Sequence, residues 1–128
     1  MANITVIGDG GWGTALAIVL NNNGHEVTLW GAFKEYTDEM VRSRNNRKFL
    51  PGIALPEGLA LRADIEDSCK NRDGFVIAVP SKFYAAVLEK FAPHIPKEAF
   101  VVSVAKGFNR EDKGLMTETA ERILPQKH

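Results

Sequence analysis

The fold is decided by the stretch GDGGWG at residues 8–13. It follows the apolar run Ile4–Ile7 and leads into residues 14–20, whose composition predicts a helix. A strand, a G-x-G-x-x-G turn and a helix in this order form the fingerprint of a dinucleotide-binding unit. Its three glycines permit the tight turn, the approach of a pyrophosphate to the backbone, and close packing of helix on strand. Free N–H groups at the start of the helix would then attract phosphate. The alternative is a glycine-rich turn that binds nothing.

Composition sets the class of protein. The chain has 128 residues, 45% of them hydrophobic, with 16 basic and 16 acidic side chains. This length predicts one domain over residues 1–128, and the balanced charge argues against nonspecific binding to nucleic acid or an anionic membrane. We see no bilayer-spanning stretch and no secretory signal. The single cysteine, Cys69, lies in a polar stretch and fits a reducing cytoplasm, so we expect a cytoplasmic protein without a nucleophilic cysteine.

Strand and helix patterns alternate along the chain. Continuous apolar runs, typical of strands covered on both faces, occupy Ile4–Ile7, Val27–Trp30, Phe75–Val79 and Phe100–Val104. Helices are predicted at Trp12–Asn22, Lys34–Ser43, Ile65–Lys70, Lys82–Phe91 and Lys113–Leu124. This order predicts right-handed crossovers and an α/β fold with a doubly wound, Rossmann-type parallel sheet.

Local signals define several boundaries. Asn23-Gly24 is a good helix C-cap, and Asp64 and Ser81 are natural N-caps for the helices that follow them. We interpret residues 44–61, which contain two Pro/Gly clusters and several apolar side chains, as one long ordered loop. No strand pattern follows the last predicted helix, so we expect the domain to be truncated before its last strands.

Five stretches together resemble the N-terminal domain of bacterial NAD(P)-dependent glycerol-3-phosphate dehydrogenases. They are residues 4–20, 23–31 and 44–53, Val79-Pro80-Ser81 and Ala105-Lys106-Gly107. The resemblance implies hydride transfer between NAD or NADP and the pair dihydroxyacetone phosphate and sn-glycerol 3-phosphate. It also implies a helical C-terminal domain, absent here, with the catalytic lysine and most of the substrate site. The fragment alone is therefore expected to be inactive, and a homodimeric full-length enzyme remains open.

The expected cofactor contacts combine the fingerprint with this resemblance. In the turn they are Gly8, Gly10, Gly11, Trp12 and Gly13; further along they are Ala32, Phe33, Phe49, Phe83 and Lys106. Core packing is the alternative for each aromatic residue. The family usually has Ser or Asn in place of Gly11, and often a large residue such as Arg in place of Ala32.

Cofactor preference stays open because no carboxylate follows the second predicted strand. Lys34, and after it Arg44 or Arg47, are candidates for contact with a 2′-phosphate, and a solvated Lys34 is the alternative. Lys106 follows the fourth predicted strand at the ligand-binding edge of the sheet. Its ammonium is our candidate for electrostatic catalysis and for substrate binding. No histidine has partners at metal-ligand spacing, so we expect no metal.

Two other functions are compatible with the glycine turn. One is a non-enzymatic dinucleotide-binding or regulatory module. The other is a different two-domain reductase, acting on a hydroxy acid or a ketopantoate-like substrate. Lys106 and the loop at residues 49–52 favour the glycerol-3-phosphate dehydrogenase interpretation over the non-enzymatic module, and the long stretch at 44–53 favours it over the other reductases.

Overall fold

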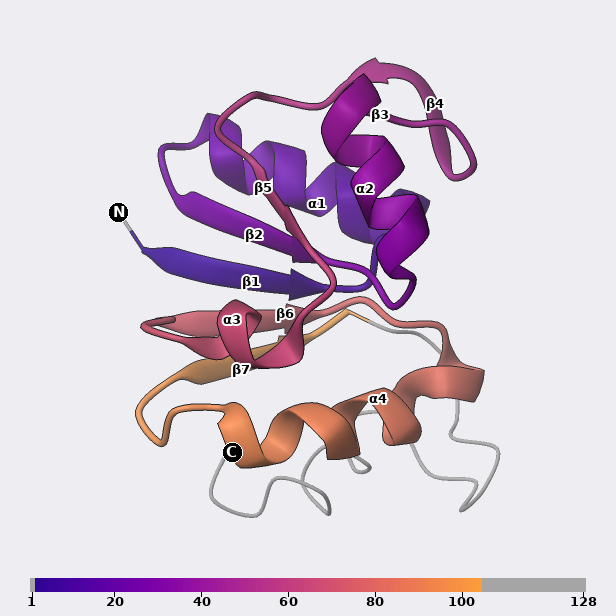
Figure 1. The fold of residues 1–128 in the computed structure, drawn as a ribbon. Helices are drawn as coiled ribbons and strands as arrows, with labels where there is room; N and C mark the ends of the chain where they lie inside the picture. The colour runs from indigo at the N-terminus through magenta and orange to yellow at the C-terminus, as the bar shows by residue number, and fades with distance from the viewer. Residues whose placement is uncertain (1, 105–128) are drawn as a thin grey trace.

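A five-stranded parallel sheet forms the centre of the molecule (Figure 1). The structure, a computed structural model, describes residues 2–104 apart from the Ser81 side chain. The strands are β1 (Asn3–Ile7), β2 (Glu26–Trp30), β5 (Ala60–Arg62), β6 (Gly74–Ile77) and β7 (Phe100–Ser103). Their order is β5-β2-β1-β6-β7, and every neighbouring pair is parallel. The chain therefore winds outward from β1 in both directions, which confirms the doubly wound fold and puts the switch point between β1 and β6.

Helices cover the two faces of the sheet. Figure 1 shows α1 (Gly11–Asn22) and α2 (Lys34–Ser43) on one face, and α3 (Ile65–Cys69) and α4 (Tyr84–Phe91) on the other. Short 3-10 turns at Ser81–Phe83 and Ala92–His94 flank α4. The helices predicted in residues 2–104 are all present, with ends shifted by at most two residues. The helix predicted at Lys113–Leu124 lies outside the described residues.

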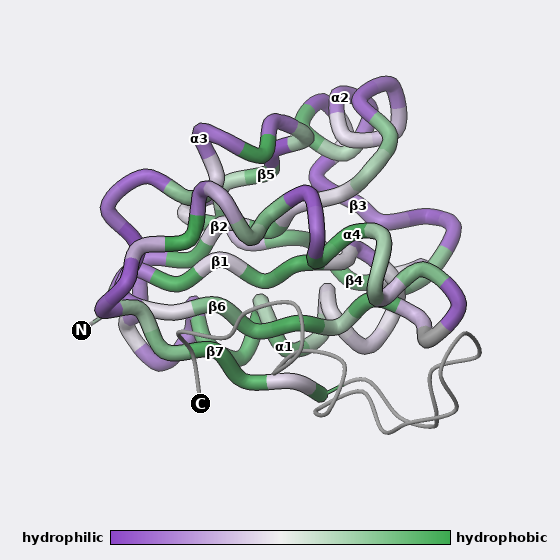
Figure 2. The backbone as a smooth tube through the Cα atoms, turned by 90° about the horizontal axis from the view of Figure 1, so that it is seen from below, coloured by the Kyte–Doolittle hydropathy of each residue, from purple (hydrophilic) through white to green (hydrophobic). Residues whose placement is uncertain are grey.

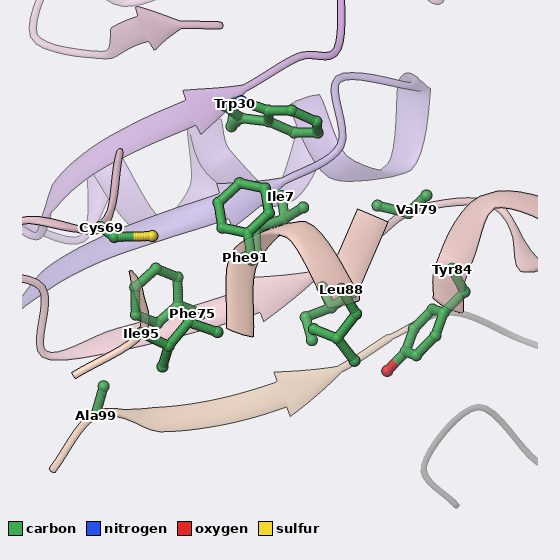
Figure 3. Packing of buried hydrophobic residues seen from close by; sticks show 11 residues of the cluster. Ile7, Trp30, Cys69, Phe75, Val79, Tyr84, Leu88, Phe91, Ile95 and Ala99 are labelled. Carbon is green, nitrogen blue, oxygen red and sulfur yellow. The ribbon is translucent and has the colours of Figure 1, made fainter. Parts of the chain in front are cut away.

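Two apolar layers hold the sheet between these helices. Strand β1 alternates between them, with Ile4 and Val6 packed toward α1 and α2 and Ile7 packed toward α4. Figure 3 shows the second layer, where the rings of Trp30 and Phe91 meet edge to face with centroids 4.9 Å apart. The apolar colour of the central strands in Figure 2 agrees with this burial on both faces. For β1, β2 and β6 the continuous apolar runs therefore marked strands covered on both faces, as expected.

Strand β7 is less completely covered than the strands at the centre. Phe100 and Val102 are each nearly half exposed in the described structure, whereas Val101 and Ser103 are partly buried. Val102 pairs with Val76 of β6, so the exposed side chains project from the face that carries α1. In the described residues, the helical layer on this face lies over β1 and β2 rather than over β7.

The stretch at 44–61 corrects the sequence interpretation. It is not one long loop: it contains the antiparallel hairpin of β3 (Asn45–Asn46) and β4 (Leu50–Ala54), followed by the beginning of β5. Strand β5 has only three residues, too few for a periodic signal, and it forms by pairing with β2. The register of the hairpin is irregular and most residues of β4 are exposed, so the sequence has no alternating apolar pattern that would predict it.

Two of the three predicted caps are present. Gly24 has φ +93°, and its N–H and that of His25 donate to the carbonyl oxygens of Asn21 and Leu20, which closes α1. The Asp64 carboxylate accepts from the backbone N–H of Asp67 at 3.2 Å.

The cap predicted at Ser81 is wrong for α4. The N-cap position is Phe83, whose own N–H donates to the carbonyl oxygen of Pro80 at 2.9 Å. This bond closes a 3-10 turn after the proline, so the α-helix begins two residues later than its predicted start at Lys82.

Candidate cofactor site

The glycine turn joins β1 to α1 at the carboxyl edge of the sheet. Gly8 has φ +116°, a conformation that side chains disfavour, and a Cβ there would lie 2.9 Å from the carbonyl oxygen of Ala78. A Cβ on Gly13 would lie 2.0 Å from the carbonyl oxygen of Gly8. Both glycines are therefore required by the fold itself, because they allow α1 to pack tightly against β1 and the end of β6.

Gly10 differs from these two glycines. Its φ of −67° suits any residue, and an added Cβ would meet nothing within 4 Å. It is the N-cap of α1, where no side chain of residues 2–104 caps the first N–H groups. The start of α1 therefore presents unpaired backbone donors beside an open space, which is the arrangement that binds phosphate.

Gly11 lies beneath the hairpin. A Cβ on Gly11 would lie 2.7 Å from the carbonyl oxygen of Phe49, in the loop between β3 and β4. The loop therefore approaches the glycine turn more closely than a Ser or Asn at position 11 would allow without a shift. The absence of a side chain here is part of how the hairpin sits over the site.

Asn46 ties the hairpin to the turn. Its side chain is fully buried, and its Nδ2 donates to the carbonyl oxygen of Asp9 and to Thr14 Oγ1, each at 2.8 Å. Its Oδ1 accepts from the Tyr36 hydroxyl of α2 and from the N–H of Phe49 at 3.3 Å. One amide thus joins the turn, both helices of this face and the hairpin loop. In the sequence, Asn46 was recognisable only as part of a stretch that resembles the family, with no role of its own.

The predicted aromatic residues do not belong to the core. Trp12, Phe33, Phe49 and Phe83 are each at least 50% exposed. Trp12 lies in the glycine turn, and the other three follow β2, β3 and β6 respectively. Ala32, beside Phe33, is also exposed. Exposed large apolar side chains gathered around the ends of parallel strands are suited to contact a ligand. Their assignment to a cofactor stays a prediction, and Lys106 lies outside the described residues.

The candidate cations for a 2′-phosphate are engaged elsewhere. Lys34 pairs with Asp38 at 2.8 Å on the exposed side of α2, and this hydrogen bond raises the pKa of its ammonium group. Arg47 pairs with Glu39 at 3.3 Å. These placements support the alternative that Lys34 is a solvated helix residue.

Arg44 has a different role from the one suggested for it. It caps α2 with φ 54°. Its guanidinium donates to the carbonyl oxygens of Leu59 at 2.9 Å and Glu57 at 3.1 Å. Arg44 thus holds the segment before β5 against the end of α2.

Asp9 is a site residue that our sequence reasoning missed. Its Oδ2 is buried without a hydrogen-bond partner among the described residues. A Cβ on Gly31 would lie 2.0 Å from this oxygen, so the carboxylate occupies the space that a side chain after β2 would take. Burial raises the pKa of Asp9, partly opposed by a hydrogen bond from its own backbone N–H. The available signal was the pairing of an acidic residue inside the fingerprint with a glycine directly after β2.

The described residues give little support to a nucleophilic cysteine, a metal site or a membrane span. Cys69 is only 2% exposed, and burial raises the pKa of its thiol to about 12, so it is a protonated core residue. In residues 2–104 no three His, Cys, Asp or Glu side chains gather as metal ligands. No helix in that range has the length and apolarity to cross a bilayer.

The sheet order and the uncapped helix start at its switch point define a dinucleotide-binding domain of the Rossmann type. A family model described as "NAD-dependent glycerol-3-phosphate dehydrogenase N-terminus" matches residues 3–128, and the chain belongs to this family. The resemblance noted in the sequence is thereby confirmed.

Individual relatives agree with this assignment. A glycerol-3-phosphate dehydrogenase [NAD(P)+] of Bacillus velezensis is 36% identical over all 128 residues, which span 37% of its length. The crystal structure of a glycerol-3-phosphate dehydrogenase from Coxiella burnetii matches 98% of this chain and 38% of its own, with a TM-score of 0.91 and 31% identity. That of the Saccharomyces cerevisiae enzyme GPD1 matches 97% of this chain and 39% of its own, with a TM-score of 0.85 and 29% identity. The chain thus spans well under half of the relatives it matches.

Proposed function

We propose that this chain binds NAD or NADP as the cofactor domain of a glycerol-3-phosphate dehydrogenase. The observation that carries the proposal is the uncapped start of α1 beside the open space at Gly10. The unpaired N–H groups would hold the pyrophosphate, because they supply both hydrogen bonds and the positive end of the helix dipole. Ala32, Phe33 and the other exposed aromatic residues would flank the adenosine and nicotinamide ends of the groove.

The complete enzyme would interconvert dihydroxyacetone phosphate and sn-glycerol 3-phosphate. When bound, the nicotinamide ring supplies or accepts the hydride. Lys106, which follows β7 in sequence, would place its ammonium near the substrate phosphate and the carbonyl oxygen, where negative charge grows during reduction. We assign the proton-donating lysine and most of the substrate site to the remaining length of the relatives. A cytoplasmic location and a homodimeric full-length enzyme belong to the same proposal.

Binding of the cofactor is tested by calorimetric titration of the 128-residue chain with NADH and NADPH. The expected result is weak binding that Gly10→Val weakens at least roughly a hundredfold, because the branched side chain fills the space a pyrophosphate needs and prevents two or more charged hydrogen bonds. The variant should remain folded, since its backbone angles and surroundings tolerate a side chain.

Gly58→Val is the matched control. Gly58 lies near Asn21, at the opposite end of α1, where an added Cβ makes only ordinary contact at 3.4 Å. It should bind NADH as the unmodified chain does. Equal NADH affinity of the Gly10→Val and unmodified chains would show that the glycine turn is not part of the binding site. If the unmodified chain bound neither NADH nor NADPH, the proposal would be overturned.

The substrate is tested separately in a full-length enzyme. NADH oxidation with dihydroxyacetone phosphate, and none with ketopantoate or another keto acid, is the expected outcome. Turnover with a keto acid alone would assign the domain to the competing class of reductases. Binding of NADH without any turnover would favour the non-enzymatic module.

A further inference from the structure

The acidic residue that usually follows the second strand of a dinucleotide-binding sheet is missing from its ordinary place. There it accepts hydrogen bonds from the adenosine ribose. Here β2 ends at Trp30 and is followed by Gly31, whose N–H donates to the carbonyl oxygen of Arg62 at 3.0 Å. The space beside Gly31 is filled by the carboxylate of Asp9, whose Oδ2, Cγ and Cβ lie 2.0, 2.6 and 3.3 Å from where a Gly31 Cβ would be. A carboxylate is therefore present at the end of β2, but it comes from the glycine turn.

The surroundings hold the Asp9 backbone in place but leave one oxygen of its carboxylate without a partner among the described residues. The Asp9 carbonyl oxygen accepts from Asn46 Nδ2 at 2.8 Å and from Thr14 Oγ1 at 3.2 Å. Its Oδ2 is buried without a partner in the described part of the chain. A buried, unpaired acceptor costs free energy, and the cost is larger for a charged group. Asp9 as a whole is partly exposed, so its carboxylate can accept hydrogen bonds from a ligand with adjacent hydroxyl groups, and a small rotation of the side chain would bring the covered Oδ2 within reach as well.

A cation facing Asp9 would pair with its carboxylate or attract a 2′-phosphate. The side chains considered above for a 2′-phosphate have other partners. Lys34 and Arg47 pair with Asp38 and Glu39. Arg62, at the end of β5, is exposed and donates from Nη1 to the carbonyl oxygen of Leu61 at 3.3 Å. Arg62 is therefore the competing residue that the test must exclude.

We propose that Asp9 binds the adenosine ribose by accepting hydrogen bonds from its hydroxyl groups. Because the same carboxylate disfavours a 2′-phosphate, the domain selects NADH over NADPH. This inference rests on the proposed function. It answers a question that the residues after Trp30 left open, namely which of the two cofactors the domain prefers. The 2′-phosphate of NADPH has no donor to offer and brings negative charge toward the carboxylate, so both the lost hydrogen bonds and the repulsion act against it.

The test compares NADH and NADPH affinities of the unmodified chain, Asp9→Asn and Asp9→Ala. The unmodified chain should bind NADH at least roughly tenfold more tightly than NADPH, the scale of one charged hydrogen bond. Both substitutions should weaken NADH binding about tenfold while leaving NADPH binding unchanged or tighter. Asp9→Asn should also raise the melting temperature of the free chain, because it removes a charge that burial disfavours. If Asp9 has only a structural role, its substitution should lower the stability of the chain and weaken the binding of NADH and NADPH equally.

A further variant tests where the carboxylate that binds the ribose has to lie. Ala32→Asp puts a carboxylate near the ordinary place, and in the Asp9→Ala background it should restore the preference for NADH. Arg62→Ala should leave the NADH/NADPH ratio unchanged.

Three outcomes would overturn the inference. They are equal affinities in the unmodified chain, a preference for NADPH that Arg62→Ala abolishes, and equal losses of both cofactors on substitution of Asp9. In each case dinucleotide binding itself would survive, so the proposed function would stand. If the unmodified chain bound neither cofactor, the proposed function and this inference would fail together.

Discussion

At the scale of single residues, the glycines of one turn have different physical roles. Gly8 and Gly13 are required by the fold, because a side chain at either would overlap a backbone carbonyl. Gly10 faces open space and is required only if a ligand approaches the backbone. Gly11 makes room for the carbonyl oxygen of Phe49 and so belongs to the packing of the hairpin. Substitutions in this turn should therefore separate loss of stability from loss of binding.

Lys106 provides the prediction about chemistry at this scale. In a full-length dehydrogenase, Lys106→Ala should lower kcat by roughly 10²–10³ and raise KM, because a fixed ammonium stabilises charge that grows in the transition state. Lys106→Arg should rescue only part of the loss, since the planar guanidinium is larger. Steady-state kinetics with dihydroxyacetone phosphate measure both constants. A wild-type kcat with only a raised KM would reduce Lys106 to a binding residue.

At the scale of elements, the hairpin β3–β4 depends on polar contacts rather than on an apolar face. Most of β4 is exposed, and its register with β3 is irregular. The hairpin is held at its base by the buried side chain of Asn46, which bonds to the glycine turn, α1, α2 and the following loop. It is also held by the N–H of Leu55, which donates to the carbonyl oxygen of Arg44 at 2.8 Å. The position of Phe49 over the site follows from these bonds.

Removal of the Asn46 amide should therefore loosen the hairpin. Asn46→Ala should lower the free energy of unfolding by about 1–3 kcal/mol, because it leaves buried polar groups without partners. NADH affinity should fall as well, since the loop carrying Phe49 loses its anchor. Urea unfolding and calorimetry measure the two effects. Asn45→Ala is the matched control, because Asn45 lies next to it but is only partly buried. Similar small effects of both substitutions would contradict the role given to Asn46.

At the scale of the whole molecule, the layer beneath α4 buries groups that titrate at alkaline pH. Burial raises the pKa of the Cys69 thiol from 9.0 to about 12, and the charge of Arg72 only partly opposes this. Burial also raises the pKa of the Tyr84 hydroxyl, which donates to Ser103 Oγ at 2.9 Å and joins α4 to β7. Figure 3 shows both side chains within this layer. The folded state thus retains protons that the unfolded chain releases.

Stability should consequently fall at alkaline pH. A group whose pKa is raised by folding stabilises the fold fully below its unfolded pKa, and this contribution disappears as pH rises through its folded pKa. For Cys69 the decline should run from about pH 9 to about pH 12. Cys69→Ala should make the melting temperature depend less steeply on pH over this range, whatever its effect at neutral pH. An unchanged slope would show that the thiol does not titrate differently in the two states.

The sequence by itself determined which segments form the four long strands and the helices within residues 2–104, in their order along the chain. It also determined the glycine turn. These features depend on contiguous residues: apolar runs long enough to be recognised, and glycines whose backbone preferences act locally. The aromatic side chains were chosen as cofactor contacts from the fingerprint, from their places along the chain and from the family resemblance, against core packing as the default for Phe33, Phe49 and Phe83. Their exposure removes core packing, and their contact with a cofactor stays a prediction.

The tertiary structure alone decided the remaining features. Strand β5 exists because β2 pairs with it, and the hairpin exists because Asn46 reaches Asp9 and Thr14, 37 and 32 residues away along the chain. The carboxylate at the end of β2 is contributed by Asp9, which only the packing of the turn against Gly31 reveals. The physical reason is common to these cases: short polar segments and single side chains take their position from distant backbone groups, and no local periodicity records which partners they will meet.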